Sequence, residues 1–211
     1  MNAVVILDYS GVALFAATGA LAASRKQLDI IGFVFLAAVA GTGGGTVRDL
    51  VLEVPVFWVE RPAYILVCAV TAISLFFTAH FAESRYRWLL WLDAAALAAY
   101  GVFGAYKGLM VTDSAIIAVV MGMLTGTLGG ILRDLLANEP TVLLCREVYV
   151  SAALAGALVF VVAEAAGAGL AVAAFAGFVA AFAIRSCALA FDWKLPVYKS
   201  KPGRDPGDLG G

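Results

Sequence analysis

The sequence predicts an all-α membrane protein with seven transmembrane helices, and three observations lead to that fold class. Hydrophobic residues make up 63% of the 211 residues and charged residues only 14%, with a mean hydropathy of +0.96. Several apolar runs approach or exceed the roughly 20 residues that cross a hydrocarbon core. The chain also repeats itself: the segment from Asp8 to Arg61 aligns without a gap, 85 residues further on, with the segment from Asp93 to Arg146.

The apolar runs define the spans in chain order. They are predicted at 5–23, 30–47, 62–82, 88–107, 114–132, 148–163 and 165–184. The first and fourth spans each contain one aspartate, Asp8 and Asp93. Trp58 and Tyr64 lie near span ends, where aromatic side chains commonly act as interfacial anchors.

The repeat divides the chain into four parts. We expect a first three-helix repeat at 5–82, a second at 88–166, a seventh helix at 167–190 and a disordered cytosolic tail at 191–211. Three spans are an odd number, so the second repeat must enter the membrane from the opposite side. The sequence therefore predicts two inverted repeats related by a pseudo-two-fold axis in the membrane plane, with helix 7 added.

Basic residues set the predicted orientation, because Lys and Arg accumulate in cytosolic loops. One side collects most of them: Arg25, Lys26, Arg85, Arg87, Arg146, Lys194, Lys199, Lys201 and Arg204. The other side has Arg61 and Lys107. We therefore expect the N-terminus outside and the C-terminus in the cytosol, with the basic tail near anionic lipid.

Each repeat carries a glycine block, and the two blocks align as 41–50 and 126–135. Their glycines are predicted to break helices 2 and 5 near the membrane centre. Freed backbone groups are tolerated there only where they face protein or a water-filled cavity, and exposed carbonyls can replace a cation's hydration shell. The alternative is that the glycines only allow close helix packing. The residues concerned are Gly43, Gly44, Gly45, Gly129 and Gly130, with hydroxyls from Thr42 and Thr127.

An arginine and an aspartate follow each block, as Arg48-Asp49 and Arg133-Asp134. A charge within the bilayer is costly, so it is usually paired or faces water. The adjacent aspartate is not expected to pair by itself, since neighbouring helical residues point about 100° apart. Each arginine is instead expected to reach the other half, with Asp93 and Asp8 as candidates. A purely structural ion pair that holds the halves together is the alternative.

Asp8 and Asp93 lie at the predicted starts of helices 1 and 4. An aspartate there caps the helix or complements its dipole. Alternatively, the two carboxylates form acidic vestibules that concentrate cations at each mouth.

Other function classes find little support. A net charge of −1 argues against a nucleic-acid partner, and one histidine with three cysteines gives no plausible metal cluster. The first glycine block lacks the Gly-Lys-Ser/Thr of a P-loop and the spacing of a dinucleotide fingerprint. We therefore expect neither an enzyme nor a cofactor.

The doubled Gly-Gly-x-x-Arg-Asp block, the proline after each and the stretch Arg146-Glu147-Val148-Tyr149 resemble prokaryotic members of the trimeric intracellular cation channel family. The same sequence family carries a provisional "glycine transporter" name for its three-helix unit. The resemblance covers about residues 5–190. It implies a homotrimer in the cell membrane, one pore inside each protomer and passive conduction of K⁺ or Na⁺, chiefly potassium, with lipid as a possible bound partner. It also implies a pore or gate role for both glycine blocks and for Arg48, Asp49, Arg133 and Asp134.

The second block departs from the first, because Leu128 replaces the glycine at Gly43. Helix 5 is therefore expected to be less broken than helix 2. A secondary transporter of a small zwitterion such as glycine, with its site at the repeat interface, remains open beside the channel. A structural oligomer without transport would leave the buried arginines unexplained.

Overall fold

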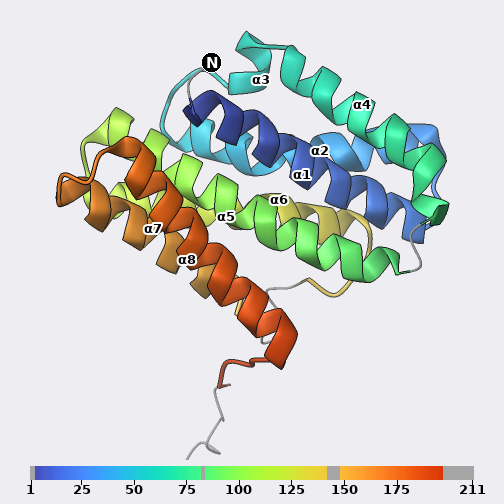
Figure 1. Ribbon diagram of the computed structural model, residues 1–211. Coiled ribbons are helices and arrows are strands. Elements are labelled where there is room, and N and C mark those ends of the chain that lie inside the picture. Colours follow the sequence, from blue (N-terminus) through green and yellow to red (C-terminus); the bar gives the residue numbers. More distant parts are fainter. Residues whose placement is uncertain (1–2, 82–83, 142–147, 197–211) are drawn as a thin grey trace, which may run out of the picture.

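The computed structural model describes residues 3–81, 84–141 and 148–196, and the elements in these ranges are helices (Figure 1). In order they are α1 (Ala3–Arg25), α2 (Ile30–Val51), α3 (Phe57–Glu60), α4 (Ala63–Thr78), the 3₁₀ turn η1 (Ala79–Phe81), α5 (Arg85–Thr112), α6 (Ala115–Leu136), α7 (Val150–Ala165) and α8 (Leu170–Phe191). The predicted all-helical fold is confirmed for this part of the chain. The short α3 was not foreseen. Arg146, Glu147 and the tail from 197 onward lie outside the described residues.

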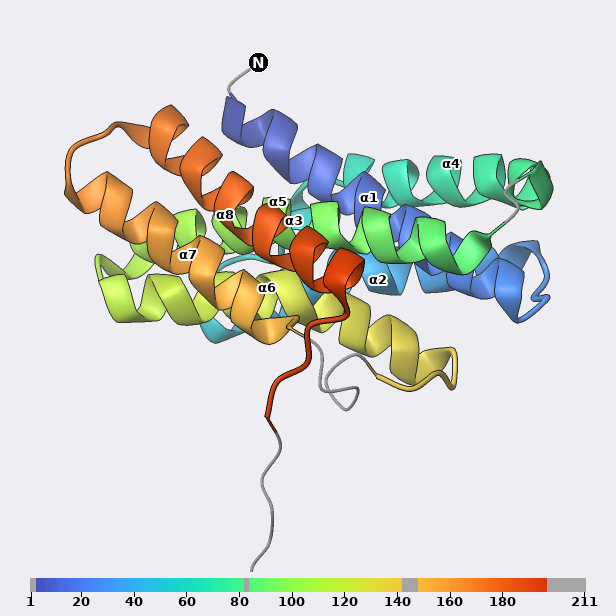
Figure 2. The ribbon, with the colours of Figure 1, turned by 60° about the horizontal axis from the view of Figure 1, so that its bottom comes forward.

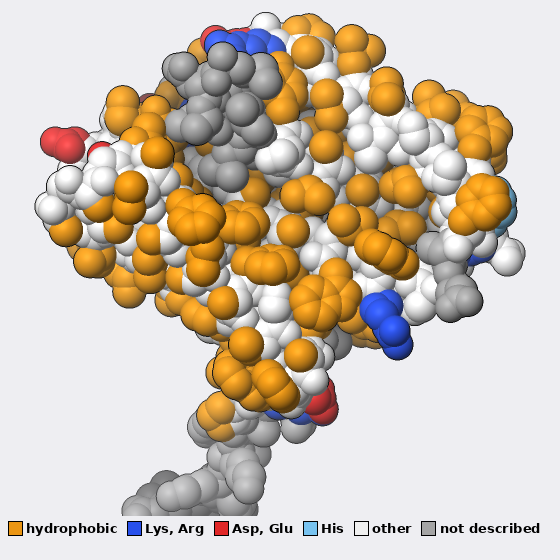
Figure 3. Space-filling model, in the orientation of Figure 1, with side chains coloured by type: hydrophobic (Ala, Val, Ile, Leu, Met, Phe, Trp, Pro, Cys, Tyr) orange, Lys and Arg blue, Asp and Glu red, His pale blue; other side chains and the backbone are white. Residues whose placement is uncertain are grey.

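Within the described residues, five helices are long and apolar enough to cross a membrane: α2, α4 with η1, α5, α6 and α8. Helix α7 is apolar but has 16 residues. Figure 3 shows a face covered by hydrophobic side chains, with charged side chains confined to a few places near its edges. Large apolar side chains such as Ile31 and Phe175 are 71% and 70% exposed. Such a surface suits a lipid environment, and the protein is a helical membrane protein. The count of seven spans stays a prediction.

The helices run side by side, with α4 at one edge of the molecule and α7 and α8 at the opposite edge (Figures 1 and 2). Helix α1 packs against α2, α4 and α5, and α2 packs against α6. Helices α1 and α5 are equivalent in the repeat, and so are α2 and α6. The centre of the molecule is therefore built from equivalent helices in contact, as a pseudo-two-fold relation requires. Helix α8 packs on α5 and α7 and has no counterpart in the first half.

The helix starts are capped by residues other than the predicted ones. Asp29 caps α2, where its Oδ1 accepts from the Gly32 N–H at 2.8 Å, and Ser84 caps α5. Asp8 and Asp93 lie within α1 and α5, several residues after each helix begins, and both are buried. The capping alternative for these two aspartates is therefore wrong, because both helices begin earlier than the apolar runs suggested.

Helices α2 and α6 continue unbroken through their glycine blocks, so the predicted breaks are wrong. The glycines serve a close crossing instead. A Cβ added at Gly44 would lie 2.5 Å from the Thr125 carbonyl oxygen, and one at Gly129 would lie 2.5 Å from that of Ala40. The two helix backbones therefore touch where both halves meet, and only glycine allows that approach.

The threonine hydroxyls of the blocks are satisfied within their own helices. Thr42 Oγ1 donates to the Ala38 carbonyl at 2.7 Å, and Thr127 Oγ1 donates to that of Met123 at 2.8 Å. Each hydroxyl retains acceptor capacity, but its proton is committed to the helix four residues back.

Candidate functional site

One pocket lies at each end of the helix bundle, the first beside Asp8 and the second beside Arg133, the partner of Asp93. We call these the Asp8 end, where α2 ends and α4 begins, and the Asp93 end, where α2 begins and α6 ends. The pocket at the Asp8 end has a volume of about 270 Å³. It is lined by Asp8, Phe57, Glu60, Arg61, Tyr64, Phe103, Tyr106 and Lys107. The pocket at the Asp93 end has a volume of about 330 Å³. It is lined by Arg25, Lys26, Tyr86, Leu89, Leu90, Arg133, Asp134, Asn138, Glu139 and Pro140.

Asp49 organises the charges at the Asp8 end. Its Oδ1 lies 2.8 Å from Arg48 Nε and 2.8 Å from Lys107 Nζ, while Oδ2 accepts from the Phe57 N–H at 3.0 Å. The Asp49 side chain is fully buried and that of Lys107 is 24% exposed. One carboxylate thus ties α2 to α3 and to α5 of the other half.

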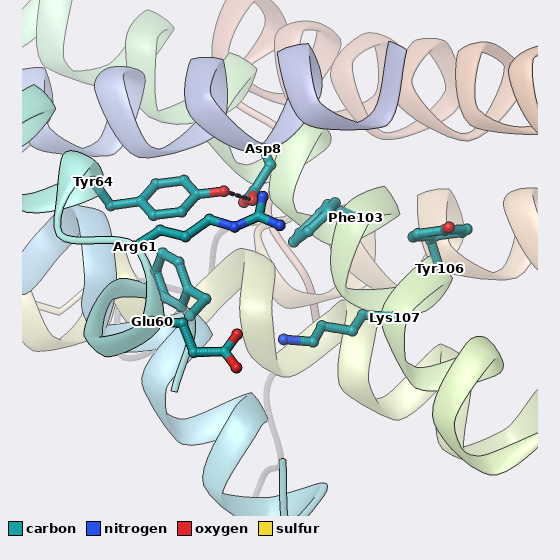
Figure 4. A pocket seen from close by; sticks show the side chains of 8 residues that line it. Asp8, Glu60, Arg61, Tyr64, Phe103, Tyr106 and Lys107 are labelled. Atoms are coloured by element: carbon teal, nitrogen blue, oxygen red, sulfur yellow. Dashed lines mark hydrogen bonds between the residues drawn. The ribbon is translucent and has the colours of Figure 1, made fainter. Parts of the chain in front are cut away.

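Asp8 and Tyr64 form a second contact at this end. The Tyr64 hydroxyl donates to Asp8 Oδ2 in a short hydrogen bond, and both side chains are buried. Figure 4 shows this bond beside Arg61, with Lys107 extending from α5 toward Glu60 of α3. The Arg48 guanidinium lies over the Phe103 ring at 5.1 Å, a cation–π distance. The pocket therefore combines both signs of charge with an aromatic wall.

Arg133 organises the Asp93 end. Its Nη1 donates to Asp93 Oδ1 at 2.7 Å, and its Nη2 donates to Asp134 Oδ1 at 2.8 Å. Arg133 and Asp93 are each 1% exposed. One guanidinium thus lies between two carboxylates at this end.

The pairing of the arginines differs from the sequence prediction in two ways. Each arginine does pair with the adjacent aspartate, because the long arginine side chain bends back across the angle between neighbouring helical positions. The second partner of Arg133 is Asp93 of the same half, not Asp8 of the other, because α5 and α6 pack closely within that half. In the part of the chain that the structure describes, Arg48 forms an ion pair with Asp49, and Lys107 provides the contact between halves.

The two ends are not equivalent, because several residues have no matching partner in the repeat. Lys107 corresponds to Ala22, so the lysine that contacts Asp49 has no equivalent lysine in the first half. Helix α8 adds Arg185, which is 1% exposed and lies 5.1 Å from the centre of the Tyr149 ring. The Asp93 end is also bridged by Arg25 and Glu139, whose side chains meet at 2.8 Å.

The predicted site residues are distributed unevenly over this geometry. Asp8 lines one pocket, and Arg133 and Asp134 line the other. Arg48, Asp49 and Asp93 lie in direct contact with these pocket residues. The glycines occupy the crossing between the two ends: an added Cβ would meet Leu132 at Gly43, Phe57 at Gly45 and the Tyr149 hydroxyl at Gly130. Their role in a pore stays a prediction.

Sequence reasoning missed Tyr64, Tyr149, Lys107 and Arg185 as members of the buried polar clusters. Tyr64 was expected to be an interfacial anchor, but it is 2% exposed and bonded to Asp8, so that expectation is wrong. A signal existed for the tyrosines, since the 85-residue register aligns Tyr64 with Tyr149. Arg185 was also visible, as a lone charge at the end of the last apolar run.

The fold and site define a class: a helical membrane protein with an internal repeat and a charged pocket at each end. A family model described as "Glycine transporter" matches residues 5–80 and 90–165, two segments that are themselves 85 residues apart. Together with the structural matches below, this match shows that the chain belongs to the trimeric intracellular cation (TRIC) channel family, among its prokaryotic members.

Known proteins are similar over nearly the whole chain. A UPF0126 membrane protein of Vibrio cholerae is 36% identical over 92% of this chain and 82% of its own length. The UPF0126 inner membrane protein YadS of Escherichia coli is also 36% identical, over 91% of this chain and 94% of its own.

Solved structures agree with these sequence matches. The TRIC channel orthologue of Rhodobacter sphaeroides superposes with a TM-score of 0.89 at 52% identity, covering 92% of this chain and 100% of that one. A second structure, which concerns the basis of conductance through TRIC cation channels, superposes with a TM-score of 0.83 at 29% identity, covering 94% of this chain and 98% of that one. These relatives are membrane proteins and channels, in agreement with the prediction that the protein is not an enzyme.

Proposed function

We propose that the protein is a channel for monovalent cations, permeable to potassium, which conducts passively through a pore inside each protomer of a homotrimer. The observation that carries this proposal is the pair of charged pockets at the two ends of one bundle, with the crossing of α2 and α6 between them. Residues of the predicted pore contribute to both ends. The names of the structural relatives point to the same activity.

The electrostatics of the clusters support cation passage despite the buried arginines. A bare arginine would repel a cation, but Arg48 and Arg133 are each held against a carboxylate at 2.8 Å. Asp93 adds a second carboxylate beside Arg133, and Asp8 lines the pocket at the other end. An arginine held against a carboxylate repels a cation less, and carboxylates at a mouth concentrate cations.

The crossing of α2 and α6 is the proposed gate. Backbone atoms of the two helices approach so closely there that no side chain fits between them. Conduction then requires the helices to separate or bend at Gly43, Gly44 and Gly45 and at Gly129 and Gly130. Glycine lowers the cost of such bending, since it weakens a helix by about 1 kcal/mol relative to alanine.

The cellular setting belongs to the same proposal. A relative from Escherichia coli is described as an inner membrane protein, and the name of the family refers to trimers. We place the chain in the cell membrane of a prokaryote with the N-terminus outside, seven spans, and lipid and two further copies of itself as its partners. The positive-inside bias of the loops supports this orientation.

Planar-bilayer recording of the purified protein in asymmetric KCl tests the channel. We expect unitary currents that reverse near the potassium potential. Two variants test whether the charged clusters lie in the pathway: Arg48→Ala/Arg133→Ala and Lys107→Met. Lys107→Met is the milder change, because the Lys107 side chain is partly exposed. Altered conductance or gating in both variants is the expected result. Tyr9→Phe, which removes a hydroxyl outside the pockets, is the control.

The transporter alternative gives a different result in the same preparation. A protein that is silent in the bilayer but takes up labelled glycine into proteoliposomes with saturation would contradict the channel. The charged pockets would then be substrate sites at the repeat interface.

A further inference from the structure

The repeat places the same three polar side chains at each end of the molecule: an aspartate, an arginine and a tyrosine. In the first half the triad is Asp8, Arg48 and Tyr64, and in the second half it is Asp93, Arg133 and Tyr149. All six side chains are buried. Both the arginine and the tyrosine are hydrogen-bond donors, and the aspartate carboxylate accepts from either.

In the first triad the carboxylate accepts from the tyrosine. Tyr64 donates to Asp8 Oδ2, and Asp8 Oδ1 has no hydrogen-bond partner among the described residues. The Arg48 Nη1 and Nη2 atoms likewise make no hydrogen bond to the described residues. Nη2 lies 2.8 Å from Asp49 Oδ1, which is an ion-pair distance, but the two groups are not aligned for a hydrogen bond. Arg48 lies over the ring of Phe103, which lines the same pocket as Asp8. The arginine is therefore the donor left out.

In the second triad the carboxylate accepts from the arginine. Arg133 Nη1 donates to Asp93 Oδ1 at 2.7 Å, while the Tyr149 hydroxyl and Asp93 Oδ2 have no hydrogen-bond partner in the described part of the chain. The Tyr149 hydroxyl nevertheless lies close to the Asp93 carboxylate. A Cβ added at Gly130 would lie 3.1 Å from Asp93 Oδ1 and nearer still to the Tyr149 hydroxyl. Here the tyrosine is the donor left out.

The donor that is unused in one triad is the donor that is used in the other. A buried polar group without a partner costs about 1–3 kcal/mol, so each triad has a reason to rearrange. The chemistry of the two triads is the same, and their environments decide which donor is bonded. At the Asp8 end Lys107 shares Asp49 with Arg48, and at the Asp93 end Arg133 joins two carboxylates.

We propose that each aspartate exchanges its arginine partner for its tyrosine partner, and that the two triads change state together in opposite senses. The structure has Asp8 on Tyr64 and Asp93 on Arg133, and the alternative state has Asp8 on Arg48 and Asp93 on Tyr149. In a protein built from repeats, each half of the alternative state would use the kind of hydrogen bond that the other half already makes in this structure. Tyr64 and Tyr149 are then positioning residues that set the partner of each aspartate.

The effect of this exchange on conduction rests on the proposed channel function. An arginine bonded to the aspartate holds its charge against that carboxylate, whereas an arginine without this bond leaves the two charges further apart. The switch thereby changes the distribution of charge at the two mouths in opposite senses, while the net charge of each mouth stays the same. The two tyrosines must then influence gating with opposite signs.

The test is single-channel recording of Tyr64→Phe and Tyr149→Phe, with Tyr106→Phe as a pocket-lining control. Each variant removes one alternative hydrogen bond and keeps the ring. We expect the ratio of open to closed time to change about fivefold in opposite directions, the equivalent of one net hydrogen bond. A purely structural role predicts no effect of Tyr149→Phe, because its hydroxyl makes no hydrogen bond in this structure. No effect of that variant, or shifts of equal sign, would overturn the switch.

A second measurement separates the switch from conduction. In the protein labelled with 3-fluorotyrosine, ¹⁹F NMR should give two resonances for Tyr64 and two for Tyr149, assigned with the phenylalanine variants. Their populations should change together when the tyrosine of the other half is replaced. A single environment for each ring contradicts the switch even if the protein conducts. If the tyrosines show coupled exchange but the protein gives no current in the bilayer, the channel proposal is contradicted and the switch is supported.

Discussion

The buried ionic groups at the two ends have unequal local support. Arg133 is surrounded by two carboxylates, whereas Arg48 shares one carboxylate with Lys107. A buried ion pair is weak evidence for net stabilisation, but removing one partner from it is costly, since an uncompensated charge is left behind. The loss of stability caused by each substitution therefore depends on how many buried charges it leaves without a partner.

Arg133→Met tests this at the residue scale. The substitution removes the cation that contacts both Asp93 and Asp134 and leaves buried Asp93 without its ion pair, so we expect a loss of about 3–5 kcal/mol. Lys107→Met is the matched control: its side chain is 24% exposed, and Asp49 keeps Arg48 and the Phe57 N–H, so a loss of about 1 kcal/mol is expected. Thermal unfolding of both variants in one detergent measures the difference. Equal losses would mean that Arg133 is not the main charge compensation at its end.

At the level of elements, the glycine blocks permit contact between α2 and α6 and leave each helix intact. Gly44 faces the Thr125 carbonyl and the Gly129 N–H, while Gly129 faces the Ala40 carbonyl. The contact is reciprocal, as the repeat requires. It places the weakest points of two long helices against each other, between the two pockets.

Gly44→Ala tests the crossing. The new methyl group would lie 2.5 Å from a backbone oxygen, which cannot rotate away as a side chain does. Overpacking of this kind typically costs about 1–3 kcal/mol. Gly101→Ala in α5 is the control, because the nearest atoms to its added Cβ lie at 3.8 Å. Alanine there should be neutral or stabilising by up to about 1 kcal/mol. If thermal unfolding in detergent ranks the two variants equally, the crossing is looser than described.

For the molecule as a whole, the first half and the second half differ in what surrounds them. Helix α8 covers α5 and α7, while α4 on the other side leaves large side chains such as Leu66 and Phe77 65% and 62% exposed. These apolar surfaces face lipid or other copies of the chain. The proposed homotrimer would cover part of them.

The homotrimer is tested by the mass of the purified protein. Light scattering with correction for bound detergent should give three times the 21.9 kDa of one chain. A mass of one or two chains in several mild detergents would contradict the proposal. A pore inside each protomer predicts in addition that one open protomer conducts alone, so recordings should show up to three equal current levels.

Much of the fold and part of the site follow from particular residues of the sequence. Long uncharged runs specified the membrane helices, because lipid tolerates few charges and every backbone group must be bonded internally. The 85-residue register identified Arg48, Asp49, Arg133 and Asp134 as equivalent charged groups, and the structure buries all four. Asp8 and Asp93 were selected for the same reason and also lie in these clusters.

The partners of these residues were decided by the tertiary structure. Whether a glycine block breaks a helix depends on the surface that it meets, and here the backbone of the equivalent helix fills the space. Lys107 and Arg185 have no counterpart in the register, so symmetry gave no reason to place them near Asp49 and Tyr149. The membrane class, the repeat and the charged residues could be predicted from the sequence alone, because they depend on composition and spacing. Only the packing of the two halves decided which donor each carboxylate accepts, because that choice depends on distances between helices.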